Sequence, residues 1–307
     1  TVHILKNHWP RTVAEMIFLG VNTGTSADAV DCVAFRFGSK GQQLLGGVSV
    51  DIHSELRQDI LAAVELSTLD TEKLMSLRHQ LTMVYSQSIQ VLMEQLSLSV
   101  NQVTAIGLHG QTIHHRPDAC YPYSLQIEDA HHLANIVGID VVGQFRASDI
   151  AAGGLGAPLI PAYHQYCLNQ AEKSTGIFLN LGGIANVTIS SPSGVLGWDV
   201  GPANALMDLW VQKCLQKPFD QGGEWARSGQ IIDDLLQQLM QDPYLQAGLP
   251  KSTGRDYFST AWLNQFTLDQ FTPEDVQATL CAFTVNSIQA DLRQHAHQCA
   301  GAPIYAY

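Results

Sequence analysis

The sequence predicts an α/β protein made of two similar units. Its 307 residues exceed the needs of one small core, which favours two domains or one large α/β unit. Three strand-like segments followed by helical patterns occur twice along the chain. Such repetition is typical of a duplicated unit, and it predicts two lobes that face a cleft with the ligand at the strand ends. We place the boundary near Gly143, which gives units of residues 1–143 and 144–307.

The first unit begins with three strand-like runs joined by turn-rich linkers, at residues 16–21, 30–37 and 43–52. Helical patterns follow at 55–66 and 72–96, where leucines such as Leu74, Leu77 and Leu81 recur at helical spacing. We then expect a strand at 103–108, short strands near 124–127 and 140–143, and a helix between these two short strands.

The second unit repeats this order. Its strands are expected at residues 176–181, 186–190 and 195–200. Its helices are expected at 203–216 and 225–240.

Composition narrows the classes of partner. The formal net charge of -12 argues against a nucleic-acid backbone or an anionic membrane as the main partner, because either would require a basic face. The six cysteines contain no CxxC pair, which indicates the reduced thiols of a cytosolic protein. Residues 1–15 lack the apolar core of a secretion signal, and residues 72–96 carry too many charges for a membrane span. We therefore expect a soluble cytoplasmic protein.

The turn after the first strand contains Gly24, Thr25, Ser26 and Asp28. A tight turn with glycine and consecutive hydroxyls directs N–H and O–H donors to one point, which suits a phosphate. Alternatively, Thr25 and Asp28 bond their own backbone in an ordinary hairpin turn. The residues of this turn alone favour neither interpretation.

The second unit has a matching turn in "NLGGIANV", residues 180–187. Gly182 and Gly183 occupy the same topological place as Gly24. These glycines would alternatively serve only to supply the positive φ that a turn requires. Two matched polar turns, one in each unit, favour a nucleotide phosphate chain bound from both sides.

Asp199 lies in "GWDVGPANALMDLW", at the expected end of the third strand of the second unit. A carboxylate at a strand end beside a helix N-terminus is placed to act as a general base or to hold Mg²⁺. The alternative is that Asp199 caps the helix that begins near Ala203 while Asn204 braces the turn. Asp208 falls inside that helix and is interpreted as structural.

Polar side chains also follow the strand at 103–108. His109, Gln111 and Thr112 are expected in a loop, where they would hydrogen-bond a sugar or an amide. His114 and His115 are read as loop residues, because no carboxylate or cysteine is spaced to complete a metal site with them.

Two further segments carry charge. Arg146 and Asp149 precede a glycine-rich turn, and Arg146 either neutralises a carboxylate or phosphate of the ligand or pairs with Asp149. The segment "PKSTGRDYF", residues 250–258, lacks the spacing of a Walker A sequence. It is either a loop on the substrate side or a connector between helices.

Taken in order, seven motifs resemble those of the anhydro-N-acetylmuramic acid kinase family: "GTSADAVD", "GLHGQTIHHRP", "FRASDIAAGGLGAPLIPAYH", "LNLGGIANV", "GWDVGPANALMD", "PKSTGRDYF" and "DVQATL". They span almost the whole chain. The resemblance implies the actin/hexokinase-like ATPase superfamily, with two RNase H-like lobes around a central cleft that binds ATP and Mg²⁺. It also implies a homodimer.

The resemblance assigns roles to the candidate residues. Gly24, Thr25, Ser26 and Asp28 would form the first phosphate loop, and Gly182, Gly183 and Asn186 the second. The sugar would contact His109, Gln111, Thr112, Arg146 and Asp149, and Mg²⁺ would come with ATP rather than occupy a fixed site. Asp199 matches the family's catalytic base. The family opens the 1,6-anhydro ring of a peptidoglycan-derived sugar with water while it phosphorylates O6 from ATP, in peptidoglycan recycling.

The chain departs from the family pattern at several positions. Asn22 and Thr23 replace a Met-Ser pair, and Ala29 and Ala203 replace glycines, of which the second would be strained at positive φ. Gln144 replaces an aspartate near the expected sugar site. The sequence stops where family members continue with an adenosine-binding turn, so we expect a shortened second unit with weak ATP affinity. A sugar-binding or regulatory pseudokinase of the same family, or another sugar kinase of the superfamily, remains an alternative.

Overall fold

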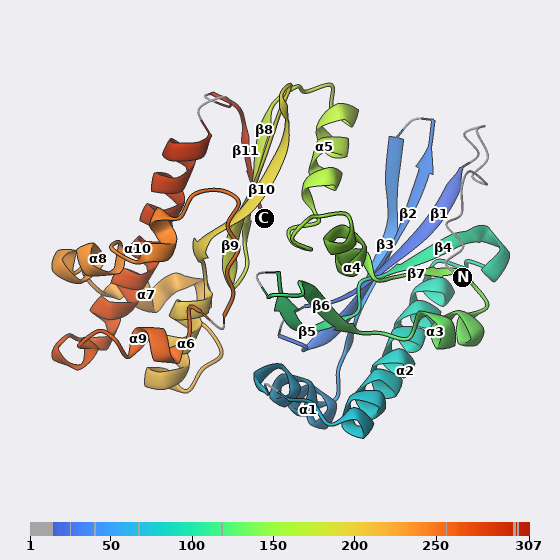
Figure 1. Ribbon diagram of the computed structural model, residues 1–307, viewed down its shortest axis with the longest axis horizontal. Coiled ribbons are helices and arrows are strands. Elements are labelled where there is room, and N and C mark those ends of the chain that lie inside the picture. Colours follow the sequence, from blue (N-terminus) through green and yellow to red (C-terminus); the bar gives the residue numbers. More distant parts are fainter. Residues whose placement is uncertain are drawn as a thin grey trace. The chain divides into compact units, whose positions relative to one another are not determined.

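A computed structural model describes residues 15–307, apart from residues 25, 40, 67, 118, 256, 297, 298 and 300 and the side chain of residue 65. The chain forms two compact units, of which the first extends to Gly156 and the second runs from Ala157 to Tyr307 (Figure 1). The boundary therefore follows Gly156, whereas the sequence placed it near Gly143. The reason is that helix α4 (Phe145–Ala151) packs on strand β6 (Tyr123–Ile127) of the first unit.

The sheet of the first unit has the strand order β3-β2-β1-β4-β7. Its strands are β1 (Met16–Thr23), β2 (Ala29–Gly38), β3 (Gly41–Asp51), β4 (Val103–Leu108) and β7 (Val141–Val142). The first three are antiparallel, and β4 and β7 run parallel to β1. This is the strand order of an RNase H-like unit.

Helices α1 (Ser54–Glu65), α2 (Thr71–Gln95) and α3 (Ala130–Val137) belong to this unit (Figure 1). Asp70 caps α2 by accepting a hydrogen bond from the Lys73 amide, which satisfies one of the free donors of the first turn. One face of α2, including Leu81 and Ile89, is buried in the same core as Leu19 of β1. The helices predicted at 55–66 and 72–96 are thus confirmed.

Strand β5 (Gln111–Arg116) pairs with β6 in a separate antiparallel ribbon. The prediction that Gln111, Thr112, His114 and His115 lie in a loop is therefore wrong. Every second residue points inward here, since Gln111 and Ile113 are 1% and 3% exposed. The strand escaped sequence analysis because one of its inward positions is polar.

The second unit repeats the topology of the first. Its sheet has the order β10-β9-β8-β11, built from β8 (Gly176–Leu181), β9 (Ile184–Ser191), β10 (Gly194–Pro202) and β11 (Ile304–Ala306). Strands β8, β9 and β10 are antiparallel, and β11 is parallel to β8. The order matches β3-β2-β1-β4 of the first unit, which confirms the α/β fold class and the duplicated strand order.

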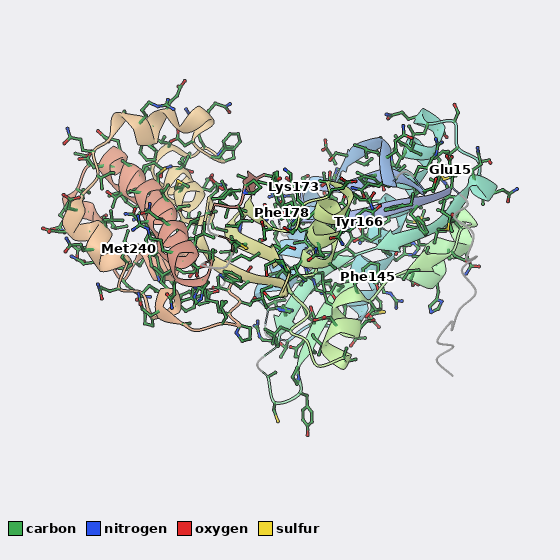
Figure 2. The ribbon with its side chains drawn as sticks, turned by 90° about the horizontal axis from the view of Figure 1, so that it is seen from above. Glu15, Phe145, Tyr166, Lys173, Phe178 and Met240 are labelled. Carbon is green, nitrogen blue, oxygen red and sulfur yellow. The ribbon has the colours of Figure 1, made fainter. Side chains whose placement is uncertain are left out.

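Longer helices of the second unit are α5 (Pro161–Gln170), α6 (Ala205–Leu215) and α10 (Pro273–His295). On one face of the sheet, the ring of His164 from α5 stacks on Phe178 of β8 at 4.1 Å between ring centroids. Figure 2 labels Phe178 of this strand and Tyr166 of the same helix. On the other face, α10 shares a core with β8 through Ile288 and Leu179. The sheet is thus covered on both faces, as an α/β unit requires.

The single helix predicted at 225–240 is wrong. The structure has α7 (Glu224–Ser228) and α8 (Asp233–Leu239) instead. Between them, a Cβ on Gly229 would clash with the backbone carbonyl oxygen of Glu274, so only glycine fits at this position. The remaining short helices are α9 (Thr260–Leu263) and the 3₁₀ turns η1 (Val100–Gln102), η2 (Gln221–Gly223), η3 (Pro243–Gln246) and η4 (Leu268–Gln270).

The structure describes all six cysteines, and they form no disulfide bond with one another. In the part of the chain that the structure describes, no helix combines the length and the apolar character that crossing a membrane would require.

Candidate active site

A row of polar residues crosses the sheet of the second unit. Asn180 of β8 lies opposite Asn186 of β9, which in turn lies opposite Asp199 of β10. Residues directly opposite each other in antiparallel strands project to the same face of the sheet. The side chain of Asn186 is therefore the neighbour of the Asp199 carboxylate.

Asp199 lies inside β10 rather than at its end. The strand continues to Pro202, with a register shift between Asp199 and Gly201. The Oδ2 atom accepts hydrogen bonds from Ser252 Oγ at 2.7 Å and from the Thr253 amide at 3.0 Å. These bonds tie the carboxylate to the "PKSTG" segment, so the alternative that Asp199 caps helix α6 is wrong.

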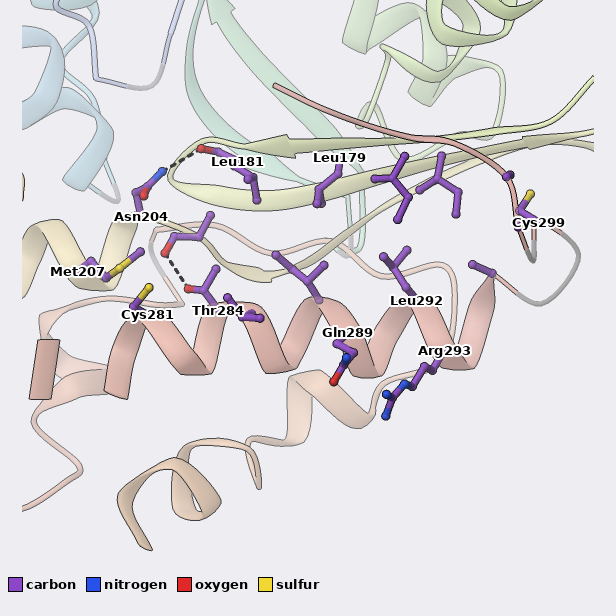
Figure 3. Close-up of a pocket in the computed structure, with 18 residues that line it drawn as sticks. Leu179, Leu181, Asn204, Met207, Cys281, Thr284, Gln289, Leu292, Arg293 and Cys299 are labelled. Atoms are coloured by element: carbon purple, nitrogen blue, oxygen red, sulfur yellow. Dashed lines mark hydrogen bonds between the residues drawn. The ribbon is translucent and has the colours of Figure 1, made fainter. Parts of the chain in front are cut away.

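Asn204 braces the second glycine turn, as the sequence suggested. Its Nδ2 donates to the carbonyl oxygen of Leu181 at 2.8 Å (Figure 3) and to that of Gly182 at 3.0 Å. The amides of Ala203 and Ala205 both donate to the carbonyl of Gly183. The start of α6 and the turn after β8 therefore form one hydrogen-bonded unit.

The glycines of this turn do not serve to supply positive φ. Gly182 and Gly183 are not among the described residues with positive φ, and neither is Ala203. A Cβ on Gly183 would instead lie 2.7 Å from Nε of Arg255. Gly183 thus leaves space for a guanidinium, and Ala203 at the family's glycine position carries no backbone strain.

Arg255 is not among the residues predicted for the site, because it lies in a connecting segment far along the chain from the glycine turn. Its charge also reaches Asp208 in the first turn of α6, where burial raises the pKa of the carboxyl group and Arg255 partly offsets this effect. A cation at a polar glycine turn is the arrangement that suits an anionic ligand.

The described side-chain hydrogen bonds of Asp28 in the first glycine turn are formed within the turn itself. Ser26 Oγ donates to Asp28 Oδ1 at 2.7 Å, and the Ala29 amide donates to the same atom at 3.2 Å. The Ser26 hydroxyl is the main reason why the pKa of Asp28 is lowered. Asp28 therefore does bond its own turn, while Gly24 is exposed. Thr25 lies outside the described residues.

His109, Arg146 and Asp149 come together at the end of β4. Arg146 Nε donates to His109 Nε2 at 3.1 Å, and Nη1 donates to the carbonyl of Gly156 at 2.7 Å. Asp149 Oδ2 accepts from the Gly156 amide at 2.7 Å. Burial, and then the charge of Arg146, lower the pKa of His109, so its ring is a neutral acceptor for Arg146.

Gln111 and Thr112 lie in the ribbon beside this cluster. The side chain of Gln111 is buried and donates to the Thr112 carbonyl at 3.2 Å. Thr112 Oγ1 accepts from Gln126 Nε2 at 3.1 Å. Both residues therefore make contacts within the ribbon.

Comparison with known proteins decides the family. The family model described as anhydro-N-acetylmuramic acid kinase matches residues 16–303. A protein of that name from Pasteurella multocida is 40% identical over 299 residues, which cover 94% of this chain and 79% of the relative. One from Aliivibrio fischeri is 40% identical over 273 residues, which cover 88% of this chain and 74% of the relative. The chain belongs to the anhydro-N-acetylmuramic acid kinase family.

A solved structure also aligns with most of the chain. The ROK hexokinase from Thermus thermophilus is 15% identical and covers 95% of this chain and 93% of its own, with a TM-score of 0.34. The fold assignment of this family member comes from its strand order.

Gln144, which replaces an aspartate of the family pattern, is hydrogen-bonded to Glu128. Glu128 is 5% exposed, and its Oε1 accepts from both the backbone amide and the side-chain Nε2 of Gln144. Burial raises the pKa of Glu128. An aspartate at position 144 would set a second carboxylate against it, whereas the amide of Gln144 donates to it. No motif in the sequence marks Glu128 as a candidate residue, because it follows a short strand outside the recognisable turns.

The second unit contains a cavity beside the start of helix α6. It measures about 830 Å³ and lies between α10 and strands β8 and β11, with apolar side chains such as Leu179 and Leu292 in its wall (Figure 3). Asn204, which braces the second glycine turn, lines this cavity, whereas none of the described residues predicted to bind phosphate or sugar or to act as the base does. Across the described part of the chain, no three His, Cys, Asp or Glu side chains form a group that could hold a metal ion.

Proposed function

We propose that this chain is an ATP-dependent kinase that converts 1,6-anhydro-N-acetylmuramic acid into N-acetylmuramic acid 6-phosphate with hydrolytic ring opening. Membership of the family over residues 16–303 supports the reaction class. The observation that carries the proposal is the Asp199 carboxylate, which is fixed by Ser252 and Thr253 and lies opposite Asn186. A fixed carboxylate beside a polar turn is the arrangement that a general base requires.

The second glycine turn suits the phosphates of ATP. Arg255 provides a guanidinium at Gly183, and the turn itself is held by Asn204. In the first unit, the exposed Gly24 and the Ser26 hydroxyl would contribute the other loop. Mg²⁺ bound to ATP would neutralise the charge that develops on the transferred phosphoryl group.

In the proposed reaction, Asp199 takes a proton from a water molecule, and the water oxygen attacks the anomeric carbon of the sugar. The bond between that carbon and O6 breaks as the ring opens. The freed O6 takes the γ-phosphoryl group of ATP in line, and ADP leaves. Asp199 then returns its proton to solvent.

We propose that the cluster at the end of β4 contacts the sugar. Arg146 belongs to this cluster, where it donates to His109 and to Gly156, and a guanidinium is the group that recognises a carboxylate such as the lactyl carboxylate of the substrate. Asp149 holds the Gly156 amide and thereby the same loop. Gln111 and Thr112 would support this cluster from the ribbon.

The family's role in peptidoglycan recycling leads us to propose a cytoplasmic location and a homodimer. Sedimentation velocity tests the homodimer, and cell fractionation tests the location.

The reaction itself is tested by incubating the chain with ATP, Mg²⁺ and 1,6-anhydro-N-acetylmuramic acid. We expect ADP and sugar 6-phosphate in equal amounts, and we expect ¹⁸O from labelled water at the anomeric carbon and not in the phosphate. Sugar binding without turnover would instead indicate a pseudokinase. Faster phosphorylation of another sugar would indicate a different sugar kinase.

A further inference from the structure

A buried ion pair links the "PKSTG" segment, which contacts Asp199, to helix α10. Lys251 Nζ is 2.6 Å from Oδ1 of Asp291, and the two side chains are 3% and 4% exposed. Lys251 comes from the "PKSTG" segment, and Asp291 comes from α10. The indole N–H of Trp198 donates to the other carboxylate oxygen of Asp291 at 2.7 Å. Every partner in this network comes from a different element of the second unit.

Two members of the network, Trp198 and Lys251, are direct neighbours of Asp199. Trp198 is the residue before Asp199 on β10. The Lys251 carbonyl accepts a hydrogen bond from the Asp199 amide at 3.3 Å, and the two residues after Lys251 are Ser252 and Thr253, which donate to Oδ2 of Asp199. A movement of Lys251 would therefore move both donors of the carboxylate.

Tyr244 contacts both Asp199 and Lys251 and so belongs to the same network. Its hydroxyl donates to the Asp199 carbonyl at 2.7 Å, and its ring lies 5.3 Å from Lys251 Nζ. Backbone and side chain of Asp199 are thus both held by groups that contact Lys251.

Stability alone is a weak reason for such a pair. A buried ion pair loses its hydration, and packed apolar side chains of similar volume often serve the fold equally well. What the pair provides is a single geometry, since a lysine and a carboxylate at 2.6 Å leave little freedom to the segment that carries them.

We propose that Lys251 and Asp291 are positioning residues, which hold the Asp199 carboxylate in its working orientation through Ser252 and Thr253. This role rests on the proposed function, because it assumes that Asp199 is the base.

The test is the double variant Lys251→Met with Asp291→Asn. It removes both charges, so no unpaired charge is left in the interior, and the new amide can still accept from Trp198. Lys213→Met is the matched control, because Lys213 lies over the ring of Trp210 on α6 and outside the network. Circular dichroism and thermal unfolding establish that both variants are folded.

We expect kcat of the double variant to fall on the order of tenfold or more, because a small displacement of a catalytic group is costly. KM for the sugar should stay within about twofold, and the control should match the wild type. A purely structural role would leave kcat of the folded double variant unchanged, and this result would overturn the proposal.

Hydrogen exchange supplies a second readout that does not depend on turnover. The Thr253 amide, which donates to Asp199, should exchange about tenfold faster or more in the double variant than in Lys213→Met, because its local structure opens more easily. Unchanged exchange at Thr253 would also overturn the positioning role. If the wild type turns over no sugar, the proposed function fails, while the exchange measurement still decides whether the pair orders this segment.

Discussion

The guanidinium of Arg255 lies against Gly183, so closely that a Cβ on Gly183 would come within 2.7 Å of Nε and 2.9 Å of Nη2. Such distances are shorter than van der Waals contact, so a side chain at position 183 must displace the guanidinium. Since Arg255 is exposed, it can move away without unfolding the unit. A side chain at position 183 should therefore affect ligand binding more than the stability of the fold.

Gly183→Ala should weaken ATP binding by about tenfold, or ~1.4 kcal/mol, because the methyl group moves Arg255 away from the second glycine turn. Thermal stability should change little. Calorimetry with ATP and Mg²⁺ measures the affinity.

Gly248→Ala is the matched control for this variant. Its added Cβ meets nothing within 4 Å, and Gly248 has no positive φ, so ATP affinity should stay at the wild-type value. In an Arg255→Ala background, Gly183→Ala should have no further effect. An equal loss of affinity in both backgrounds would show that the glycine acts independently of Arg255.

Asn204→Ala should loosen the second glycine turn, because it removes both hydrogen bonds to the carbonyls of Leu181 and Gly182. We expect a loss of roughly 1 kcal/mol in the free energy of unfolding, together with weaker ATP binding. Denaturant unfolding and calorimetry measure the two effects. Asn169→Ala on α5 is the control, since Asn169 is exposed and its described side-chain hydrogen bond is the one that it accepts from Gln165. A similar loss of ATP affinity in this control would contradict the prediction.

The regular strands could be predicted because their apolar residues alternate or run together. Strands 103–108 and 176–181 have the bounds that the sequence indicated. Strand β5 could not be recognised, since its inward Gln111 and its two half-buried histidines hide the alternation. Local pattern thus predicts an element well only where its buried face is apolar.

The candidate site was predictable in its residue types and not in its contacts. Asp199 stands out in the sequence, but its partners Ser252 and Thr253 are more than fifty residues away, and no local spacing indicates such a pairing. Local spacing does not indicate the contact between Glu128 and Gln144 either, although these two residues are only 16 positions apart. Tertiary hydrogen bonds of this kind depend on how the elements pack.

Gln144→Asp should make stability more sensitive to pH. The pKa of Glu128 is raised by burial, so the folded state holds this proton more tightly than the unfolded state does. That stabilisation is complete below the ordinary pKa of a glutamic acid, and it is lost as pH rises through the raised value. A second carboxylate at position 144 raises this pKa further, so the variant should lose about 1 kcal/mol or more relative to wild type at pH 8 and less at pH 5.

Thermal unfolding at the two pH values measures the effect of Gln144→Asp. The control is the exchange Glu128→Gln with Gln144→Asp, which keeps one carboxyl group and one amide and should remove most of the added pH dependence. Equal losses at pH 5 and pH 8 would contradict the assignment to Glu128. Sugar affinity should change more than kcat in Gln144→Asp, because position 144 precedes Arg146 and does not contact Asp199 in the described hydrogen bonds.

Asp199→Asn should abolish most of the turnover while sugar binding stays nearly intact. The amide oxygen of asparagine can still accept from Ser252 and Thr253, which both bond to Oδ2 of Asp199, so the side chain should keep its orientation. What the variant loses is the capacity to take a proton from water. Removal of a general base lowers kcat by about a hundredfold or more.

The rate of sugar phosphorylation and the calorimetric affinity for 1,6-anhydro-N-acetylmuramic acid together decide the role of Asp199. Asp234→Asn is the matched control. Asp234 is exposed in the first turn of α8, so this variant makes the same chemical change outside the site. If kcat of Asp199→Asn equals that of the control, Asp199 is not the base. If sugar affinity falls as far as kcat, Asp199 binds the substrate instead of activating water. A low kcat with wild-type sugar affinity is the combination that only a base predicts, since binding contacts and orientation are both retained in the variant.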